Sequence, residues 1–214
     1  MAYYYLVSQL PYLVYGQAAP LSSVQFKALC KAALHPQDAV LLECCTLDPD
    51  PEAQLQGAGK GGSYWDAPRA TASTFIDGWR HWERALRLHL ARYRAQALGQ
   101  EGAASVDPPE EPVEAGALAK VALGLDSPLE AELFLDQARW NAIEALQGFD
   151  YFGVNTIYAY LLRLLLMERR ASFRAEEGFT AYKGLYTAIM TAASGLASEG
   201  GRVSEISIES GEPK

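Results

Sequence analysis

Two acidic side chains lie among apolar residues in the second half of the chain, where they could take part in acid–base chemistry. In the stretch SPLEAELFLDQARW (residues 127–140), a helical spacing of about 100° per residue places Asp136 in the middle of an apolar stripe. Glu168 has the same kind of position on a helix predicted to begin at Val154. Because burial raises the pKa of a carboxyl group, these two residues are the best candidates for a general acid or base.

A structural ion-pair network is the interpretation that we favour for the two carboxylates. A buried charge needs a partner, and arginine can hold a carboxylate through two parallel hydrogen bonds. Arg139 lies three residues after Asp136, on the same side of the helix. We expect the network to consist of Asp136, Arg139, Arg163, Glu168 and Arg169.

Other kinds of catalytic chemistry have little support in the sequence. The three histidines, His35, His81 and His89, do not have the spacing of a metal site. The chain has no GxSxG elbow and no dinucleotide fingerprint, and its GAGKGG stretch lacks the spacing of a phosphate-binding loop. We therefore expect no catalytic residue, cofactor or metal, and no enzyme activity. The alternative is a helical enzyme or metal-binding protein that uses Asp136 and Glu168.

Length and composition indicate a globular protein with a sizeable core. The chain has 214 residues, of which 50% are hydrophobic, which suits one domain or two small lobes. Its formal net charge of −8 argues against general nucleic-acid binding, which needs a basic surface. The N-terminus lacks the pattern of a secretory signal, and the longest apolar run, YAYLLRLLLM, is interrupted by Arg163 and too short to span a bilayer. We therefore expect a cytoplasmic protein.

The cysteines are expected to be free thiols. Cys30, Cys44 and Cys45 are odd in number and lack metal-ligand spacing, and the adjacent pair does not suit an ordinary disulfide. Free cysteine is among the residues most often buried. We therefore expect the three to pack in the core, in a reducing compartment.

Helix-start signals divide the chain into amphipathic helices. Ser22 with Gln25 and Ser127 with Glu130 match the capping box, in which two side chains satisfy the first free amides of a helix. A proline at the first helical position costs no hydrogen bond, because the amide there has no partner inside the helix. The predicted helices begin at Ser22, Pro36, Thr74 (to about Ala97), Ser127 and Val154, with a further one over roughly 178–193.

Changes in composition predict two helical lobes. Residues 1–98 form the N-terminal lobe, with a loop at about 48–72 that is rich in Asp, Pro and Gly and expected to be mobile. An acidic, Pro/Gly-rich linker is predicted over 99–126, a C-terminal lobe over 127–193 and a polar tail over 194–214. The expected fold is all-α, with amphipathic antiparallel helices in both lobes.

Three arginines on the helix predicted over 74–97 are a candidate docking face. Arg80, Arg84 and Arg87 line a side of this helix that differs from its apolar side. Such a stripe can be an ordinary solvated face. It can also be a docking surface for an acidic partner or for an acidic segment of the same chain, and the sequence leaves both interpretations open.

Four stretches of the sequence carry a family resemblance. They are YYYLVSQLP, WERALRLHLARYRA, SPLEAELFLDQARWNAIEAL and FDYFGVNTIYAYLLRLLLMERRASF, of which PLEAE…LD…RW is the most specific. They resemble an uncharacterised bacterial family whose genes lie among those of V-type (A/V-type) rotary ATPases. That family is distantly similar to the ATPase's C subunit (d in eukaryotes), an all-helical, funnel-like repeat protein that seats the central stalk on the membrane ring.

The resemblance implies a mechanical role in a proton- or sodium-transporting complex. The chain would be a C/d-like, non-enzymatic subunit or assembly factor that links the central stalk to the membrane ring. Its partners would be stalk and ring subunits, without nucleic acid or cofactor, and it would lie peripherally at the inner face of the cytoplasmic membrane. Because the chain is much shorter than a C subunit, it would not form a complete funnel. A free-standing helical adaptor is the further alternative.

Overall fold

Every regular element in the described part of the chain is a helix, which confirms the all-α class. The computed structural model describes residues 3–47, 71–99, 107–173 and 182–191. The chain divides into two units, Met1–Ala171 and Ser172–Lys214. Nearly all of the predicted loop at 48–72, and the whole predicted tail, lie outside the described residues.

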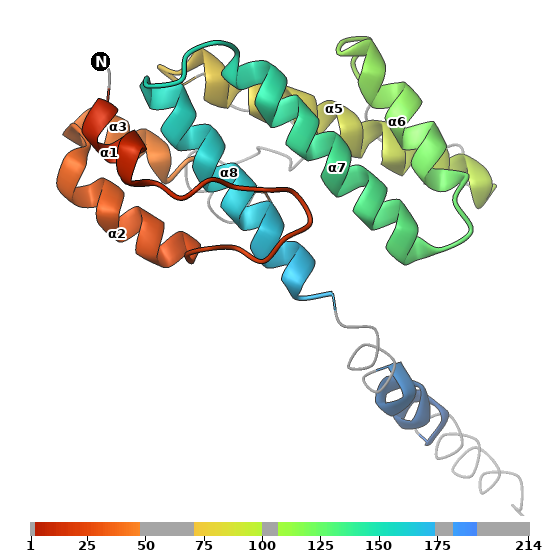
Figure 1. The fold of residues 1–214 in the computed structure, drawn as a ribbon. Coiled ribbons are helices and arrows are strands. Elements are labelled where there is room, and N and C mark those ends of the chain that lie inside the picture. The colour runs from red at the N-terminus through yellow and green to blue at the C-terminus, as the bar shows by residue number, and fades with distance from the viewer. Residues whose placement is uncertain (1–2, 48–70, 100–106, 174–181, 192–214) are drawn as a thin grey trace, which may run out of the picture. The chain divides into compact units, whose positions relative to one another are not determined.

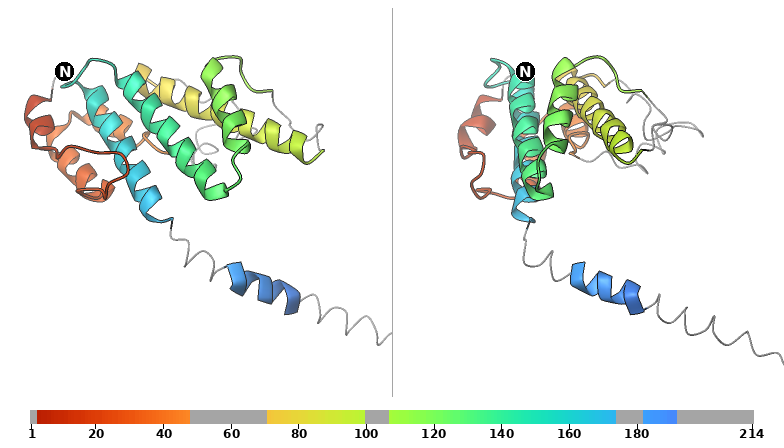
Figure 2. Two further views of the ribbon diagram at one scale, coloured as in Figure 1. Left: turned by 45° about the vertical axis from the view of Figure 1, so that its right-hand side comes forward. Right: turned by 90° about the vertical axis from the view of Figure 1, so that its right-hand side faces the viewer.

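The first unit is a helical bundle with its last helix, α8, at the centre. Helix α8 packs against α7 on one side and α2 on another, while α5 packs along α6 and α7 (Figures 1 and 2). The second unit contains a helix over residues 182–191. The helices of the first unit are α1 (Tyr4–Gln9), α2 (Ser23–Ala33), α3 (Pro36–Leu42), α5 (Thr74–Ala97), α6 (Val113–Leu123), α7 (Pro128–Gln147) and α8 (Val154–Ala171).

The predicted helix starts are confirmed by the caps that form there. Ser22 and Gln25 make the complete capping box of α2, with hydrogen bonds of 3.0 and 3.2 Å. The Ser127 hydroxyl accepts from the amide of Glu130 at the start of α7. At the other end of α7, Gly148 has φ of 61° and ψ of −141°, a conformation that essentially only glycine adopts, and it allows the sharp turn into α8.

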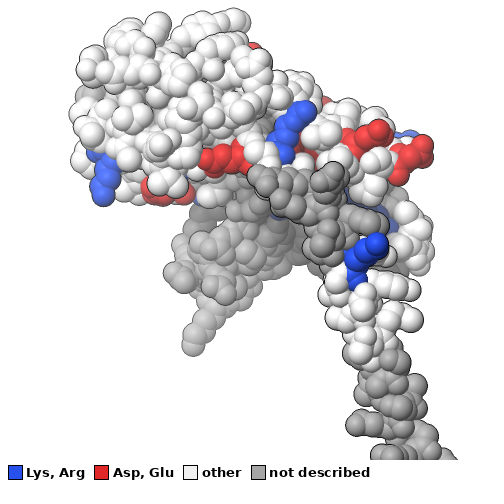
Figure 3. Space-filling view, turned by 60° about the horizontal axis from the view of Figure 1, so that its bottom comes forward, with Lys and Arg blue, Asp and Glu red and all other residues white. Residues whose placement is uncertain are grey.

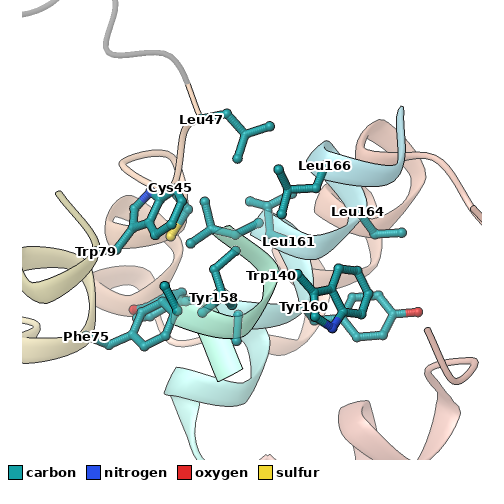
Figure 4. Close-up of a cluster of buried hydrophobic side chains, with 14 of the residues drawn as sticks. Cys45, Leu47, Phe75, Trp79, Trp140, Tyr158, Tyr160, Leu161, Leu164 and Leu166 are labelled. Carbon is teal, nitrogen blue, oxygen red and sulfur yellow. The ribbon is translucent and has the colours of Figure 1, made fainter. Parts of the chain in front are cut away.

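Helix α8 is buried on nearly all sides, which explains why it forms the centre of the bundle. Ile157, Tyr158, Leu161, Leu162 and Leu164 are all 0% exposed. In Figure 4, labelled side chains from α5, α7 and α8 converge with those of the segment that follows α3. A helix that is hydrophobic all round must be covered on every side, and here the N-terminal helices complete the cover.

Two tyrosines of α8 show how the N-terminal segment is held across this helix. The hydroxyl of Tyr158 donates to the carbonyl oxygen of Asp38 at 3.2 Å, and that of Tyr160 donates to the carbonyl oxygen of Pro11 at 2.8 Å. Helices from both sides of residues 99–126 share one core, so these residues do not separate two lobes as predicted. The chain divides after Ala171 instead.

The predicted linker contains helix α6, which corrects the expectation for residues 113–123. The ring Nε2 of His81 donates to the carbonyl oxygen of Glu111 at 3.1 Å, and that of His89 donates to Pro109 at 3.3 Å. Gly116 faces His89 so closely that an added Cβ would lie 3.2 Å from the ring. The buried residues of α6 are all alanine, with Gly116 beside them, and these small residues give only a weak apolar period in the sequence.

The cysteines provide a test of this packing. Cys30 and Cys45 are buried and Cys44 is half-buried, and burial raises the pKa of the Cys30 thiol to about 12. Because the thiolate is the reactive form, we expect Cys44 alone to react with a thiol reagent in the native state. Cys30 and Cys45 should react only after unfolding. The Cys44→Ser variant should lose the fast phase, and three equal rates in the native wild type would contradict the packing.

Candidate functional site

The candidate site is built around Arg139, whose side chain is only 4% exposed. Its Nε donates to Oε2 of Glu83 at 3.0 Å, and its Nη2 donates to Oε1 of the same carboxylate at 3.1 Å. Its Nη1 donates to Oδ1 of Asp136 at 3.0 Å. One arginine of α7 therefore binds two carboxylates, one from α5 and one from α7 itself.

Two further arginines extend these contacts to α8 and to the segment after α3. On α5, Arg87 donates from Nε to Oε1 of Glu83 at 2.7 Å and from Nη2 to the carbonyl oxygen of Leu47 at 2.8 Å. On α8, Arg169 donates from Nη2 to Oε2 of Glu132 at 2.7 Å, and its Nη1 lies 3.9 Å from Oδ1 of Asp136. We call the six charged residues the arginine network: Glu83, Arg87, Glu132, Asp136, Arg139 and Arg169.

The charges of the arginine network balance, with three acids and three arginines. The network connects α5, α7 and α8, the three longest helices of the first unit. Breaking a buried ion pair by removing one partner costs far more than an exposed pair contributes, because an uncompensated charge is left in the core. The arrangement is therefore suited to fixing the three helices in one register.

Burial and nearby positive charge act in opposite directions on the pKa of Asp136. Its side chain is 0% exposed, and its Oδ2 has no hydrogen-bond partner among the described residues. Burial raises the pKa of this carboxyl, while the positive charges of Arg169 and Arg139 act in the opposite direction. Ionised Asp136 is consequently less favourable in the folded protein than in the unfolded chain.

This raised pKa predicts a pH dependence that the Asp136→Asn variant should lack. Between the ordinary value of 3.8 and the higher native pKa, the folded protein retains a proton that the unfolded chain has released. Folding stability from this group is therefore full below that window and falls as pH rises through it. Measured by urea unfolding from about pH 4 to about pH 7, the wild type should lose stability relative to the variant. A stability difference that does not change with pH would contradict the assignment.

The structure brings together three of the five residues predicted for the ion-pair network. Asp136, Arg139 and Arg169 meet in the arginine network. The guanidinium group of Arg163 instead lies over the ring of Trp140, 5.3 Å from its centroid. Its Nε is buried without a hydrogen-bond partner among the described residues, and burial lowers its pKa.

Glu168 has a different structural task. Its Oε1 accepts a hydrogen bond of 2.6 Å from the backbone amide of Ser23, the first residue of α2. A carboxylate in this position satisfies a free amide and complements the positive end of the helix dipole. Glu168 therefore attaches α2 to α8, and the amide that it binds is not a partner of Asp136.

Sequence reasoning missed Glu83, the carboxylate with the most contacts in the arginine network. Its side chain is 5% exposed. Glu83 lies four residues after Trp79 and three before Leu86, so it shares their side of α5. The signal that identified Asp136, an acid among apolar residues at helical spacing, was present here as well.

The predicted docking face on α5 is partly occupied by this chain. Arg80 donates to the carbonyl oxygen of Cys44 at 3.5 Å, and Arg87 binds Leu47 and Glu83 as described above. Arg84 is half-buried and makes further interactions. At least two of the three arginines therefore hold the segment after α3, so the face is no simple solvated stripe.

The described residues contain neither a metal-binding cluster nor a helix that could cross a membrane. Among the residues that the structure describes, no group of three or more His, Cys, Asp or Glu side chains could hold a metal ion. In the same ranges, none of the helices combines the length and the apolar character that crossing a bilayer requires.

Comparison with known proteins gives one family match. The profile of a protein family of unknown function, DUF2764, matches residues 123–192. No curated protein matches the chain, and no solved structure does. The matched segment contains α7 and α8, which contribute Glu132, Asp136, Arg139 and Arg169 to the arginine network. Over this third of its length, the chain is similar to a family whose function is unknown.

Proposed function

We propose that the chain is a non-enzymatic, C/d-like subunit or assembly factor of a bacterial V-type rotary ATPase. In this role it links the central stalk to the membrane ring. The observation that carries the non-enzymatic part is the arginine network, in which the buried carboxylates of Glu83 and Asp136 are held by Arg139. Carboxylates held in this way fix helices, whereas a general acid or base must reach a substrate.

The mechanical role is supported by the way in which the helices are joined. A part that passes torque or sets an order of assembly must keep its helices in fixed positions. The arginine network connects α5, α7 and α8, and Glu168 attaches α2 to α8. These contacts oppose sliding of one helix along another, because such a movement would break the buried pairs of Arg139, the half-buried pair of Arg169 or the hydrogen bond of Glu168.

The ATPase assignment is supported by the resemblance of the four sequence stretches described above. Those stretches form α1, most of α5, α7 and α8, which are elements of the shared core. The resemblance therefore concerns the framework of the first unit. The proposed role is accordingly a bridging contact between the stalk and the ring.

Transport by membrane vesicles tests this function. In vesicles from cells that lack the gene, ATP hydrolysis by the soluble part of the ATPase should persist, while ATP-driven proton or sodium uptake should be lost. The wild-type gene should restore uptake. A variant with Lys27 replaced by alanine should restore it equally, because Lys27 pairs with Glu43 at the surface, outside the arginine network. Normal uptake and normal subunit content without the gene would contradict the proposal.

The alternative use of Asp136 and Glu168 as a catalytic or metal site makes a different prediction. A metal that binds the native state raises the melting temperature. Melting with and without divalent metals should leave the midpoint unchanged if both carboxylates are structural. A metal-dependent rise that the Asp136→Asn variant abolishes would favour the alternative.

A further inference from the structure

Five exposed aromatic side chains lie on two segments of the chain that meet, and the arginine network uses none of them. Helix α1 contributes two of them, and the turn between α7 and α8 contributes the other three. Large apolar side chains exposed singly are normal, whereas a contiguous group indicates a binding surface. We call the group the aromatic patch: Tyr4 (62% exposed), Tyr5 (77%), Phe149 (92%), Tyr151 (61%) and Phe152 (44%).

The two parts of the aromatic patch are joined by specific contacts. The backbone amide of Tyr3 donates to the carbonyl oxygen of Phe152 at 2.6 Å. The rings of Tyr4 and Phe152 lie 4.8 Å apart, and α1 lies beside the start of α8 in Figure 1. A hydrogen bond within the turn between α7 and α8 stabilises it: Oδ1 of Asp150 accepts from the amide of Gly153 at 2.8 Å. The two segments that carry the patch are therefore fixed to each other before any binding, which lowers the entropy cost of ordering them.

Charge is nearly absent from the segments that build the aromatic patch. Residues 1–26 contain no Asp, Glu, Lys, Arg or His, and residues 145–162 contain only Asp150. Figure 3 shows a different face, toward the bottom of Figure 1, where a wide area likewise bears few charged side chains. An uncharged aromatic surface can be buried without desolvating charges, which is typical of the core of a protein interface.

The area of the aromatic patch is close to one side of an ordinary interface. At roughly 200 Å² for each ring, the five exposed fractions together present on the order of 700 Å². A standard interface buries about 800 Å² on each partner. A few neighbouring side chains would supply the difference.

We propose that the aromatic patch is the contact surface of a homodimer, in which a second copy of the chain packs the same patch against it. A two-fold interface must be complementary to itself. An uncharged aromatic surface meets this condition without any opposite charges, whereas the chain's formal net charge of −8 makes copies repel one another elsewhere. An anionic lipid surface fits less well, since the two segments supply no Lys or Arg for headgroups. This inference is independent of the proposed ATPase role.

Sedimentation equilibrium of the full chain tests the dimer. The wild type should approach the mass of two chains as its concentration rises. The double variant Tyr5→Glu with Phe149→Glu should remain at the mass of one chain with unchanged helicity, because it places charges in the interface. Val113→Glu is the matched control, since Val113 is 80% exposed and lies outside the patch, and it should dimerise as the wild type does.

Three results would overturn the proposal. They are a wild type that is monomeric at every concentration, a patch variant that still dimerises, and equal loss of the dimer in the Val113→Glu control. Flotation with phosphatidylcholine vesicles tests whether the aromatic patch binds a lipid surface instead of a second copy of the chain. Binding of a monomeric wild type to these vesicles, lost in the patch variant, would assign the patch to a lipid surface.

Discussion

Replacing Arg139 with alanine should lower the free energy of unfolding by about 3–5 kcal/mol. The reason is that Glu83 and Asp136 would both remain in the core without their principal partner. Burial of an unpaired carboxylate costs several times what an exposed ion pair contributes. Urea unfolding followed by circular dichroism measures the change directly, and the loss should appear as a lower midpoint with an unchanged slope.

Lys27→Ala is the matched control for this prediction. Lys27 pairs with Glu43 at the surface, so its removal should change the free energy of unfolding by only about 0–1 kcal/mol. A second comparison combines Arg139→Ala with Glu83→Gln. Because Glu83 and Arg139 are in contact, the double variant should lose less stability than the two single changes added together. Equal losses for Arg139→Ala and Lys27→Ala would show that the arginine network contributes little.

Trp79→Ala should also destabilise the fold by about 3–5 kcal/mol. Trp79 is 1% exposed, and its ring stacks on that of Trp82 with centroids 5.9 Å apart. Its Nε1 donates to the carbonyl oxygen of Thr46 at 3.0 Å. The substitution would therefore leave a cavity and release the segment that follows α3. The measurement is the same urea titration, supported by faster thiol labelling of the neighbouring Cys45.

Two further variants separate the causes of this loss. Trp79→Phe keeps an aromatic ring but removes the indole hydrogen bond, so it should cost less than the alanine change. Tyr12→Ala removes an aromatic ring that is 89% exposed, and its effect should lie within about 0.5 kcal/mol. If Trp79→Ala were no more destabilising than Tyr12→Ala, the position of α5 in the core would be wrong.

Local signals in the sequence predicted the principal helices well. The capping residues Ser22 and Ser127 and the proline at position 36 give the starts of α2, α7 and α3. These signals act within one turn of a helix, so they can be recognised without knowledge of the rest of the fold. The all-α class follows from the same local information.

Contacts between distant elements could not be predicted in the same way. Periodicity placed Asp136 on the buried side of α7, but it could not show that Glu83, on a different helix, would share Arg139 with it. Glu168 illustrates the same limit, because its partner is a backbone amide 145 residues away. Every residue except proline has a backbone amide, so the sequence does not indicate which amide Glu168 will bind.

Helix α6 and the common core were missed for a related reason. The contact side of α6 contains Ala115, Gly116 and Ala119, whose value is that they let two helices approach closely. A helix is recognised in a sequence mainly by a periodic pattern of large apolar side chains. A face of alanine and glycine lacks that pattern, so it resembles a linker when proline and glutamate precede it. The shared core of the two predicted lobes depends on α8 being covered on all sides, which only the packing reveals.

Affinity purification of the tagged chain from its own cells, in mild detergent, tests the central claim most directly. Mass spectrometry of the proteins that purify with it should identify stalk and ring subunits of the V-type ATPase, in a ratio to the tagged chain that is nearly constant between preparations. The Lys27→Ala variant should give the same ratio. Absence of these subunits, from material that is folded and abundant, would contradict the proposed role in the ATPase.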